Sequence, residues 1–349
     1  MPADQSRLPE PRGVTSFQVA IEPLGHTIAC RSDQTLLDAC IQAGVPARYN
    51  CRSGECGECI AALCAGEVSE LPGADPAVFD DAKRAAGQIL LCMCFPRAPV
   101  RVDVPLNSDG PAIRPQTVDV TVRAIARVTP TIYQVSLATP GPVEYRAGQC
   151  FEWVLPGIAP NRIYSAANRP GGDHIDFHVR VYPGGKVGDH LQHTLTVGQA
   201  MQIFGPFGQF GLSASDWRPS LCVAGGTGLA PIHAILDQAF AHGDRRPIRF
   251  YFGARNQAEL YCRERLLAWA RTSPSFQFIP VLSDEPLDSG WTGKRGLVTE
   301  VVAQEIEDPF GLEAYVCGPP AMIDAAVAVF EAAGLSPDDI HTDRFVQAR

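Results

Sequence analysis

The sequence feature that most constrains this chain is a run of closely spaced cysteines, CRSGECGEC, which places Cys51, Cys56 and Cys59 in one short loop. Eight of the twelve cysteines precede residue 105. Disulfides belong mainly to exported proteins, and the polar, proline-containing start of the chain lacks the apolar stretch of a secretory signal. We therefore expect a cytoplasmic protein whose clustered cysteines bind a metal or a redox centre.

The spacing of these cysteines, C-x4-C-x2-C with a further cysteine much later, is that of a plant-type [2Fe–2S] site. Gly54 and Gly57 let the loop bend sharply, so that three thiolates can converge. Two cysteines of the segment ILLCMCFP, Cys92 and Cys94, are candidates for the fourth ligand. The segment resembles the end of a plant-type ferredoxin, in which the ligand lies four residues before a proline, and Pro96 then selects Cys92.

The alternative for these cysteines is a structural zinc site. Such sites usually have two C-x2-C pairs or added histidines, and this segment has neither. The remaining cysteines before residue 105 show no ligand spacing, and we assign them to the hydrophobic core, where free cysteines are usually found. The sequence therefore predicts an iron–sulfur centre with four ligands: Cys51, Cys56, Cys59 and Cys92.

The length of 349 residues predicts two or three domains. The pattern changes twice along the chain, which we divide into a disordered N-terminus (1–15), a cysteine-containing domain (16–106), a linker (107–116), an all-β domain (117–213) and an α/β domain (214–349). In the first domain we expect a helix, TLLDACIQA, between an N-cap at Asp33 and a stop at Gly44.

The two later domains differ in the periodicity of their hydrophobic residues. Residues 117–213 hold short strand-like runs separated by glycine and proline turns, which is typical of a barrel or sandwich. Residues 214–349 alternate between strand and helix, which predicts a parallel sheet covered by helices. The net charge of -9 argues against nucleic-acid binding. The chain also has no apolar run of the roughly 18 residues that a membrane span needs.

The strand-like segment RIYS carries three residue types that a flavin site requires, in Arg162, Tyr164 and Ser165. A flavin dinucleotide needs a cation for its pyrophosphate, an aromatic face for its ring system and a hydroxyl near its reactive N5 atom. Strand alternation places Arg162 and Tyr164 on one face and Ser165 on the other. Taken alone, these four residues could equally form an exposed strand edge.

A glycine pair lies further along the all-β domain, in the sequence GGKVGDHL. Glycines that open a helix let backbone amides approach an anion at the helix N-terminus. We therefore expect a phosphate-binding site formed by Gly184, Gly185, Lys186 and Val187.

Two further loops follow strand-like runs in the α/β domain. The first, in LCVAGGTGLAPI, consists of Gly225, Gly226, Thr227 and Gly228. A dinucleotide needs such a tight turn, a close backbone approach and a helix N-terminus, although a plain strand–helix connection would look similar. The second, in CGPPAM, holds Cys317, Gly318 and Pro319. Ligands of open α/β sheets bind at this edge; a buried thiol at a helix start is the alternative.

The choice between NADH and NADPH is expected to depend on the sequence SDEP, after the third strand of the α/β domain. Asp284 and Glu285 would repel the 2′-phosphate of NADPH, whereas an arginine there would bind it. Arg255 is a feature that favours NADPH. The two carboxylates predict NADH.

Together these motifs establish a resemblance. Over residues 17–349 the chain is similar to the ferredoxin–NADP reductase superfamily, and more closely to the electron-transfer reductases of bacterial Rieske aromatic-ring dioxygenases and hydroxylases. The resemblance implies three domains in the order ferredoxin, FAD, NAD. Their folds would be a plant-type ferredoxin β-grasp (α+β), an FAD-binding antiparallel β-barrel and an α/β parallel-sheet NAD-binding domain.

The resemblance also implies roles for individual residues. The family's RxYS motif binds flavin, its glycine pair holds the FAD pyrophosphate and its GGTG loop binds NAD. Cys317 would lie beside the nicotinamide and, with Ser165, near the reacting atoms. An aromatic residue near the family's C-terminus covers the flavin, which makes Phe345 the candidate here and Asp343 its polar neighbour. One departure is Gly188, where the family usually has a serine or threonine that contacts the pyrophosphate.

The function implied is that of an NADH-dependent enzyme with FAD and a [2Fe–2S] cluster. It would act as a monomer and pass single electrons from NADH to a ferredoxin or to the oxygenase of an aromatic-degrading system. Glu55 and Glu58 beside the cysteine loop would form an acidic rim for docking. The alternatives are a reductase for a soluble di-iron monooxygenase or for deoxysugar dehydration, and a non-enzymatic electron carrier. The IHTDRF and LLCMC segments favour the ring-hydroxylating group.

Overall fold

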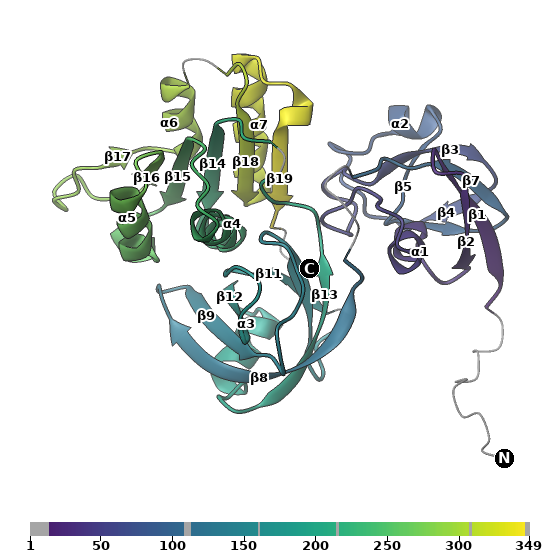
Figure 1. Cartoon of the computed structure of the whole chain (residues 1–349), viewed down its shortest axis with the longest axis horizontal. Helices are drawn as coiled ribbons and strands as arrows, with labels where there is room; N and C mark the ends of the chain where they lie inside the picture. Colours follow the sequence, from purple (N-terminus) through teal and green to yellow (C-terminus); the bar gives the residue numbers. More distant parts are fainter. Residues whose placement is uncertain (1–13, 108–112, 160, 214–215, 307–308, 346–349) are drawn as a thin grey trace. The chain divides into compact units, whose positions relative to one another are not determined.

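The computed structural model describes residues 14–107, 113–159, 161–213, 216–306 and 309–345. The chain divides into two compact units, residues 1–114 and 115–349 (Figure 1). Of the expected disordered N-terminus and linker, residues 1–13 and 108–112 lie outside the described residues. Among the described residues no helix is both long and apolar enough to cross a membrane.

The first unit contains a five-stranded mixed sheet with the strand order β2-β1-β7-β3-β5. Strands β1 and β7 are parallel, and the other neighbours are antiparallel. The strands are β1 (Ser16–Glu22), β2 (His26–Arg31), β3 (Ile60–Ala65), β5 (Gln88–Leu90) and β7 (Val100–Asp103). A two-stranded sheet, β4 (Val68–Glu70) with β6 (Cys94–Pro96), and the short helix α2 (Asp81–Ala85) complete the unit with α1. This is the β-grasp that the sequence predicted.

Helix α1 (Leu36–Ala43) begins later than expected. Its N-cap is Thr35, whose hydroxyl accepts a hydrogen bond from the Asp38 backbone at 3.0 Å. The predicted cap at Asp33 is wrong, because that carboxylate pairs with Arg31 at 2.8 Å instead. The predicted end is confirmed, since Gly44 adopts a left-handed conformation with φ +74°, which suits a glycine C-cap.

The second unit begins with a six-stranded antiparallel sheet in the order β11-β10-β13-β8-β9-β12. An isolated bridge between Ala166 and Phe177 joins the two ends of this order, so the sheet closes into a barrel. Its core includes the fully buried Phe151, Trp153 and Phe177. The elements are β8 (Gln116–Arg127), β9 (Ile132–Ala138), β10 (Cys150–Val154), β11 (Arg162–Ser165), β12 (His174–Arg180), α3 (Lys186–His193) and β13 (Ala200–Phe207).

The chain then forms a parallel sheet in the order β17-β16-β15-β14-β18-β19. Helices α4 and α5 pack on one face, and α6 and α7 on the other (Figure 1). The strands are β14 (Ser220–Gly225), β15 (Ile248–Ala254), β16 (Phe276–Leu282), β17 (Lys294–Arg295), β18 (Glu313–Gly318) and β19 (Ile340–Arg344). The helices are α4 (Leu229–Ala241), α5 (Arg263–Thr272), α6 (Val298–Glu305) and α7 (Pro320–Ala333), with three short 3-10 turns at Gly226–Gly228, Gln257–Glu259 and Pro337–Asp339. The fold class predicted from the sequence is therefore confirmed.

Candidate functional site

The four cysteines of the predicted iron–sulfur centre form two pairs. The sulfur atoms of Cys59 and Cys92 lie 3.3 Å apart. The backbone nitrogen of Cys51 lies 3.5 Å from the sulfur of Cys56. Among the described residues no three Cys, His, Asp or Glu side chains gather as ligands of a single metal ion. Two thiol pairs suit a [2Fe–2S] cluster, which takes two thiolates on each iron, better than a zinc ion with four ligands around one centre.

The loop surrounds the sulfur of Cys51 with hydrogen-bond donors. The amides of Ser53 and Glu55 each lie 3.4 Å from that sulfur. A hydrogen bond from the Cys56 thiol, together with these amides, lowers the pKa of Cys51 to about 5. Thiolates are the form that binds iron, so the loop favours this charge state at Cys51, while the same bond raises the pKa of the Cys56 thiol.

Glycines shape this loop as expected. Gly54 and Gly57 have φ angles of +81° and +79°, which side chains with a Cβ rarely adopt. A Cβ at Gly54 would lie 3.1 Å from the Met93 side chain, and one at Gly57 would lie 2.9 Å from Val78. Cys94 belongs to neither thiol pair; it lies on strand β6, where burial raises its thiol pKa to about 12.

The rim of the cysteine loop is mixed in charge rather than acidic. Glu58 pairs with Arg48 at 3.1 Å, while Glu55 accepts a hydrogen bond from Ser53 at 3.0 Å. The pair is half-buried, and ion pairs near the surface contribute only about 0–1 kcal/mol to stability. Their effect here is to neutralise Glu58, so the expectation of an acidic rim is wrong for that residue.

The flavin motif lies on strand β11 of the barrel, with the alternation that the sequence predicted. Tyr164 packs on Trp153, with ring centroids 4.8 Å apart, and burial raises the pKa of its hydroxyl. Arg162 is half-buried, opposite Trp153 in the neighbouring strand, whereas Ser165 is only 5% exposed. The indole nitrogen of Trp153 is buried without a hydrogen-bond partner among the described residues. An aromatic pair beside a cation is a suitable flavin environment.

The glycine pair opens helix α3 as predicted. Gly184 has φ +73°, Gly185 is the N-cap of α3, and no side chain caps that end. The amides of Lys186 and Val187 in the first turn are therefore available to an anion. The departure at Gly188 has a steric reason, because a Cβ there would lie 2.8 Å from the side chain of Val181.

The two loops of the parallel sheet meet through their glycines. Strands β14 and β18 are neighbours, so Gly228 and Cys317 lie at the same edge of the sheet. A Cβ at Gly228 would collide with the carbonyl oxygen of Cys317. A Cβ at Gly225 would lie 2.6 Å from the sulfur of Met322. Only glycine permits this close approach, which brings GGTG and CGPP together.

Ser165 and Cys317 are joined by Asp343 of the last strand. The Asp343 carboxylate lies 3.4 Å from the Ser165 hydroxyl and 3.8 Å from the Cys317 sulfur. Burial, reinforced by the nearby Asp343 carboxylate, raises the pKa of Cys317 well above its ordinary value, so the thiol stays protonated. Phe345 follows, and its backbone N–H donates to the Gly318 carbonyl at 2.9 Å. The residues predicted to lie near the reacting atoms are thus brought together from the barrel, from strand β18 and from strand β19.

Sequence reasoning missed a group of polar residues around the GGTG loop. The guanidinium of Arg180 would lie within 3.0–3.2 Å of a Cβ on Gly226, and it pairs with Glu259 at 3.6 Å. The hydroxyl of Tyr261 donates to the Gly226 carbonyl at 3.2 Å and lies 3.1 Å from the ring of His178. These residues come from β12 and from the segment between β15 and α5, and no local pattern in the sequence marks their meeting.

The predicted NADH selector, Asp284, is exposed at the end of strand β16, where its backbone N–H donates to Arg255 at 2.7 Å. Its neighbour Glu285 is held by the backbone and side chain of Gln257 at 2.8 Å and 2.6 Å. Gln257 also lines a cavity of about 580 Å³, together with Arg263 and Trp291. Among the described residues, the Glu285 carboxylate is therefore held by hydrogen bonds from Gln257, whereas no such bond holds the Asp284 carboxylate.

Family models match each of the three domains. A 2Fe-2S iron-sulfur cluster binding domain matches residues 19–97, an oxidoreductase FAD-binding domain matches 119–211, and an oxidoreductase NAD-binding domain matches 222–328. Over 339 residues the chain is 35% identical to the phenol hydroxylase P5 protein of Acinetobacter pittii (strain PHEA-2), covering 95% of each chain. This chain belongs to the iron–sulfur flavoprotein reductases of oxygenase systems. The fold class and the three cofactors expected of this reductase, [2Fe–2S], FAD and NAD, are confirmed by these matches.

Other members extend this family likeness. The reductase is 32% identical to the ferredoxin–NAD(P)(+) reductase component of the naphthalene 1,2-dioxygenase/salicylate 5-hydroxylase systems of Ralstonia sp., covering 94% of this chain and 98% of that protein. Among solved structures, the Amycolatopsis cytochrome P450 reductase GcoB superposes with a TM-score of 0.82 at 33% identity. The match covers 94% of this chain and 98% of that one. The reductase is therefore an oxidoreductase whose electron acceptor is a protein.

Proposed function

We propose that this reductase takes a hydride from NADH and passes single electrons to a ferredoxin or to the oxygenase of a system that oxidises aromatic compounds. The observation that carries the proposal is the meeting of Ser165, Asp343 and Cys317, because it joins the flavin strand to the nicotinamide edge of the sheet. NADH gives two electrons at once and a [2Fe–2S] cluster accepts one. A flavin supplies the exchange between two-electron and one-electron steps.

The barrel holds the flavin through residues of β11 and α3. Arg162 provides the cation for the pyrophosphate and Tyr164 the aromatic face. The free amides at the start of α3, from Gly184 to Val187, bind the same pyrophosphate. No hydroxyl is needed at position 188, where Val181 leaves no room for one.

The parallel sheet binds the nicotinamide dinucleotide at the edge formed by β14 and β18. The loop Gly225–Gly228 receives the phosphates at the start of helix α4. Cys317, Gly318 and Pro319 line the nicotinamide side, and the backbone N–H of Phe345 bonds to the Gly318 carbonyl. These residues orient the ring and exclude water from it.

The Ser165 hydroxyl and the Cys317 thiol are the polar groups nearest the proposed point of transfer. Asp343 accepts a hydrogen bond from each, which fixes both side chains in one orientation. The serine hydroxyl donates to Asp343, and Ser165 would lie beside the reactive N5 atom of a bound flavin, where hydride is received. Neither residue transfers a proton to solvent in this scheme, and their contribution is orientation.

The iron–sulfur centre is held by Cys51, Cys56, Cys59 and Cys92. The chain connects this centre to the flavin domain covalently, which raises their effective concentration, so internal electron transfer does not wait for a bimolecular encounter. We propose that the protein works as a monomer in the cytoplasm, where its thiols stay reduced.

The class of oxygenase is the open part of the proposal. The relatives serve a phenol hydroxylase, a naphthalene dioxygenase/salicylate hydroxylase system and a cytochrome P450. Phenol stands in the names of relatives that are 35% and 33% identical to this chain, whereas reductases of propane 2-monooxygenases are 30–31% identical. This difference supports an aromatic compound here. We retain a ring-hydroxylating oxygenase as the proposed partner.

Reduction of cytochrome c by NADH tests the enzymatic role. The protein, loaded with FAD and iron–sulfur cluster, is expected to reduce cytochrome c catalytically, and Cys56→Ala is expected to slow this transfer. A loaded protein that does not turn over would support the non-enzymatic carrier instead. Product formation with purified oxygenases of the phenol-hydroxylase and dioxygenase classes then distinguishes the partners.

A further inference from the structure

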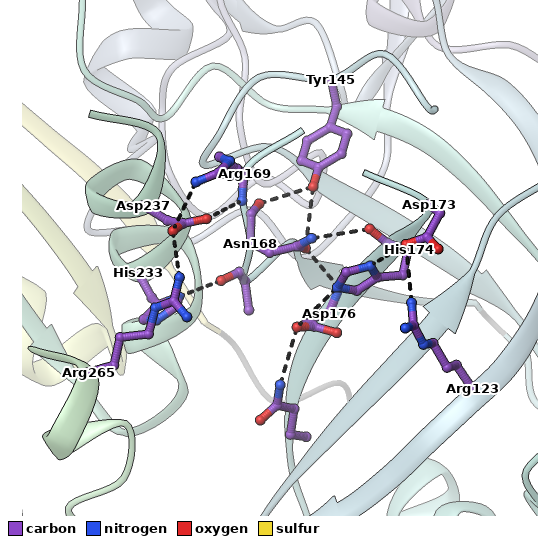
Figure 2. Close-up of polar contacts among 12 residues, drawn as sticks. Arg123, Tyr145, Asn168, Arg169, Asp173, His174, Asp176, His233, Asp237 and Arg265 are labelled. Carbon is purple, nitrogen blue, oxygen red and sulfur yellow. Dashed lines mark hydrogen bonds and ion pairs between the residues drawn. The ribbon is translucent and has the colours of Figure 1, made fainter. Parts of the chain in front are cut away.

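Helix α4 contacts the barrel through two polar side chains on one face. His233 and Asp237 are four residues apart, so they lie one above the other on the helix. Both are buried, with exposed fractions of 9% and 7%. Figure 2 shows both side chains facing the barrel segment that follows strand β11. Buried polar groups at a domain contact require partners, and here the partners belong to that segment.

His233 bonds directly to the end of the flavin strand. Its Nδ1 atom lies 2.6 Å from the carbonyl oxygen of Ala167, two residues after Ser165. A carbonyl oxygen can only accept, so Nδ1 carries the proton. Burial, with a smaller effect of Arg265, lowers the pKa of the ring, which is therefore neutral. Its Nε2 atom is buried and has no hydrogen-bond partner among the described residues.

Asp237 strengthens the same contact one turn further along α4. Its carboxylate accepts a hydrogen bond from the Arg169 backbone at 3.4 Å and pairs with the Arg169 guanidinium at 3.6 Å (Figure 2). Arg265 of helix α5 donates to the same carboxylate at 2.8 Å. The α5 side chains also hold the histidine in place, because Trp269 packs on the His233 ring with centroids 5.0 Å apart.

These contacts form a short connection between the two halves of the proposed reaction site. Helix α4 begins directly after the Gly226–Gly228 turn, and His233 is on its second turn. At the other end of the bond is Ala167, two residues after Ser165. Its N–H donates to the backbone carbonyl of Asp176 in β12 at 2.7 Å. A shift of the His233 bond would therefore move the Ser165 strand relative to the GGTG loop.

We propose that His233 is a positioning residue for hydride transfer, whose Nδ1–H bond to Ala167 holds the flavin strand at a fixed distance from the nicotinamide loop. The inference rests on the proposed function. Burying the unpaired Nε2 atom of His233 is unfavourable, and an apolar side chain of similar size would avoid this cost. What histidine adds at this place is the bond from Nδ1 to Ala167.

Two conservative variants separate the hydrogen bond from the volume of the ring. In His233→Asn, the side-chain amide nitrogen takes nearly the position of Nδ1 and keeps the bond. In His233→Gln, the amide nitrogen corresponds to Nε2, so a polar residue of similar size loses it. His242→Gln is the matched control, since His242 is exposed at the end of the same helix.

The first readout needs no substrate. Hydrogen–deuterium exchange of the segment 162–169 is measured in the full chain without NADH. Because the bond to Ala167 restrains this segment, exchange is expected to be faster in His233→Gln than in the wild type, and unchanged in His233→Asn and His242→Gln. Equal exchange in His233→Gln and wild type would overturn the inference.

The second readout is the reductive half-reaction in a stopped-flow spectrometer. His233→Gln is expected to lower the limiting rate of flavin reduction about 10-fold, with the Kd for NADH changed less than about twofold, because alignment rather than binding is lost. His233→Asn is expected to stay within about threefold of the wild type. Equal rates in the Gln and Asn variants, or a change in Kd alone, would contradict a positioning role.

Failure of this inference is distinguishable from failure of the proposed function. A wild-type protein with FAD and cluster that NADH does not reduce would refute the function itself. A wild type that NADH reduces normally, with both His233 variants behaving like it, would refute the role of His233 alone.

Discussion

The hydroxyl of Ser165 lies 3.4 Å from the carboxylate of Asp343, although 178 residues separate them in the chain. Ser165 ends a barrel strand, and Asp343 belongs to the last strand of the parallel sheet. The bond therefore crosses the contact between the flavin and nicotinamide domains. Cys317 shares the same carboxylate at 3.8 Å.

This relationship predicts that Asp343→Asn slows hydride transfer. The amide would present a donor as well as an acceptor, so Ser165 and Cys317 would no longer share one fixed acceptor. We expect the rate of flavin reduction by NADH to fall by about 10- to 100-fold, a typical loss when reacting groups are misaligned. The exposed Asp338 of the same C-terminal region provides the control, and Asp338→Asn should reduce flavin at the normal rate. Equal rates in Asp343→Asn and wild type would exclude this role.

The four cysteine ligands and the flavin motif lie in different domains, which predicts that the iron–sulfur cluster and the FAD can be lost independently. Cys56→Ala removes a ligand from one pair and should abolish the red-brown absorbance of the cluster, while NADH-driven reduction of ferricyanide through FAD is largely retained. Cys64, which we expected in the hydrophobic core, is instead an exposed cysteine of the same domain. Cys64→Ala should therefore retain both properties. Loss of ferricyanide reduction in Cys56→Ala, with FAD still bound, would contradict separate centres.

The exposed carboxylate of Asp284 predicts the coenzyme preference. Removing its charge in Asp284→Ala should narrow the preference for NADH over NADPH by about 10-fold, which corresponds to about 1.4 kcal/mol of lost repulsion. Asp288 is exposed in the same loop. Asp288→Ala should leave the ratio of kcat/KM for NADH to kcat/KM for NADPH unchanged. A ratio that is equally unchanged in Asp284→Ala would leave Glu285, held by Gln257, as the selecting carboxylate.

The buried His178 predicts a loss of stability in acid. Burial lowers its pKa from 6.5 to about 3. Between these values the unfolded chain binds a proton that the folded chain does not. The stabilising contribution is therefore complete above pH 6.5 and is lost as the pH falls toward 3. At about pH 5 the loss is about 2 kcal/mol.

Denaturant unfolding of the full chain at neutral pH and at about pH 5 measures this effect. His178→Asn is neutral at both pH values and can still bond to the Tyr261 hydroxyl. We expect the difference in unfolding free energy between the two conditions to be smaller in the variant than in the wild type. The same difference in both proteins would show that another group causes the acid sensitivity.

Much of this protein was predictable because its binding motifs are local. The cysteine loop, RIYS, GGTG and CGPP each combine a fixed spacing with a strand end, and strand ends are where such ligands bind. Glycine positions were equally informative, since Gly54 and Gly57 have the positive φ angles that their place in the loop requires.

The remainder depends on how distant segments pack. Arg180, Tyr261 and His233 acquire their roles only when the barrel meets the parallel sheet, and no spacing in the sequence encodes that contact. The cap of α1 was placed at Asp33 because aspartate is a common N-cap, but the ion pair with Arg31 competes for its carboxylate and Thr35 caps the helix. The expected acidic rim was wrong at Glu58 for a similar reason, since the ion pair of Arg48 with Glu58 is a tertiary contact.

The central claim is that nicotinamide, flavin and cluster form one electron relay within this chain. Anaerobic titration of the purified protein with NADH, followed by absorbance, tests it most directly. FAD takes two electrons and the cluster one, so we predict that both chromophores bleach and that about 1.5 equivalents of NADH per chain complete the titration. A flavin that bleaches with about one equivalent while the cluster stays oxidised would contradict the relay. So would a protein that contains no iron with inorganic sulfide.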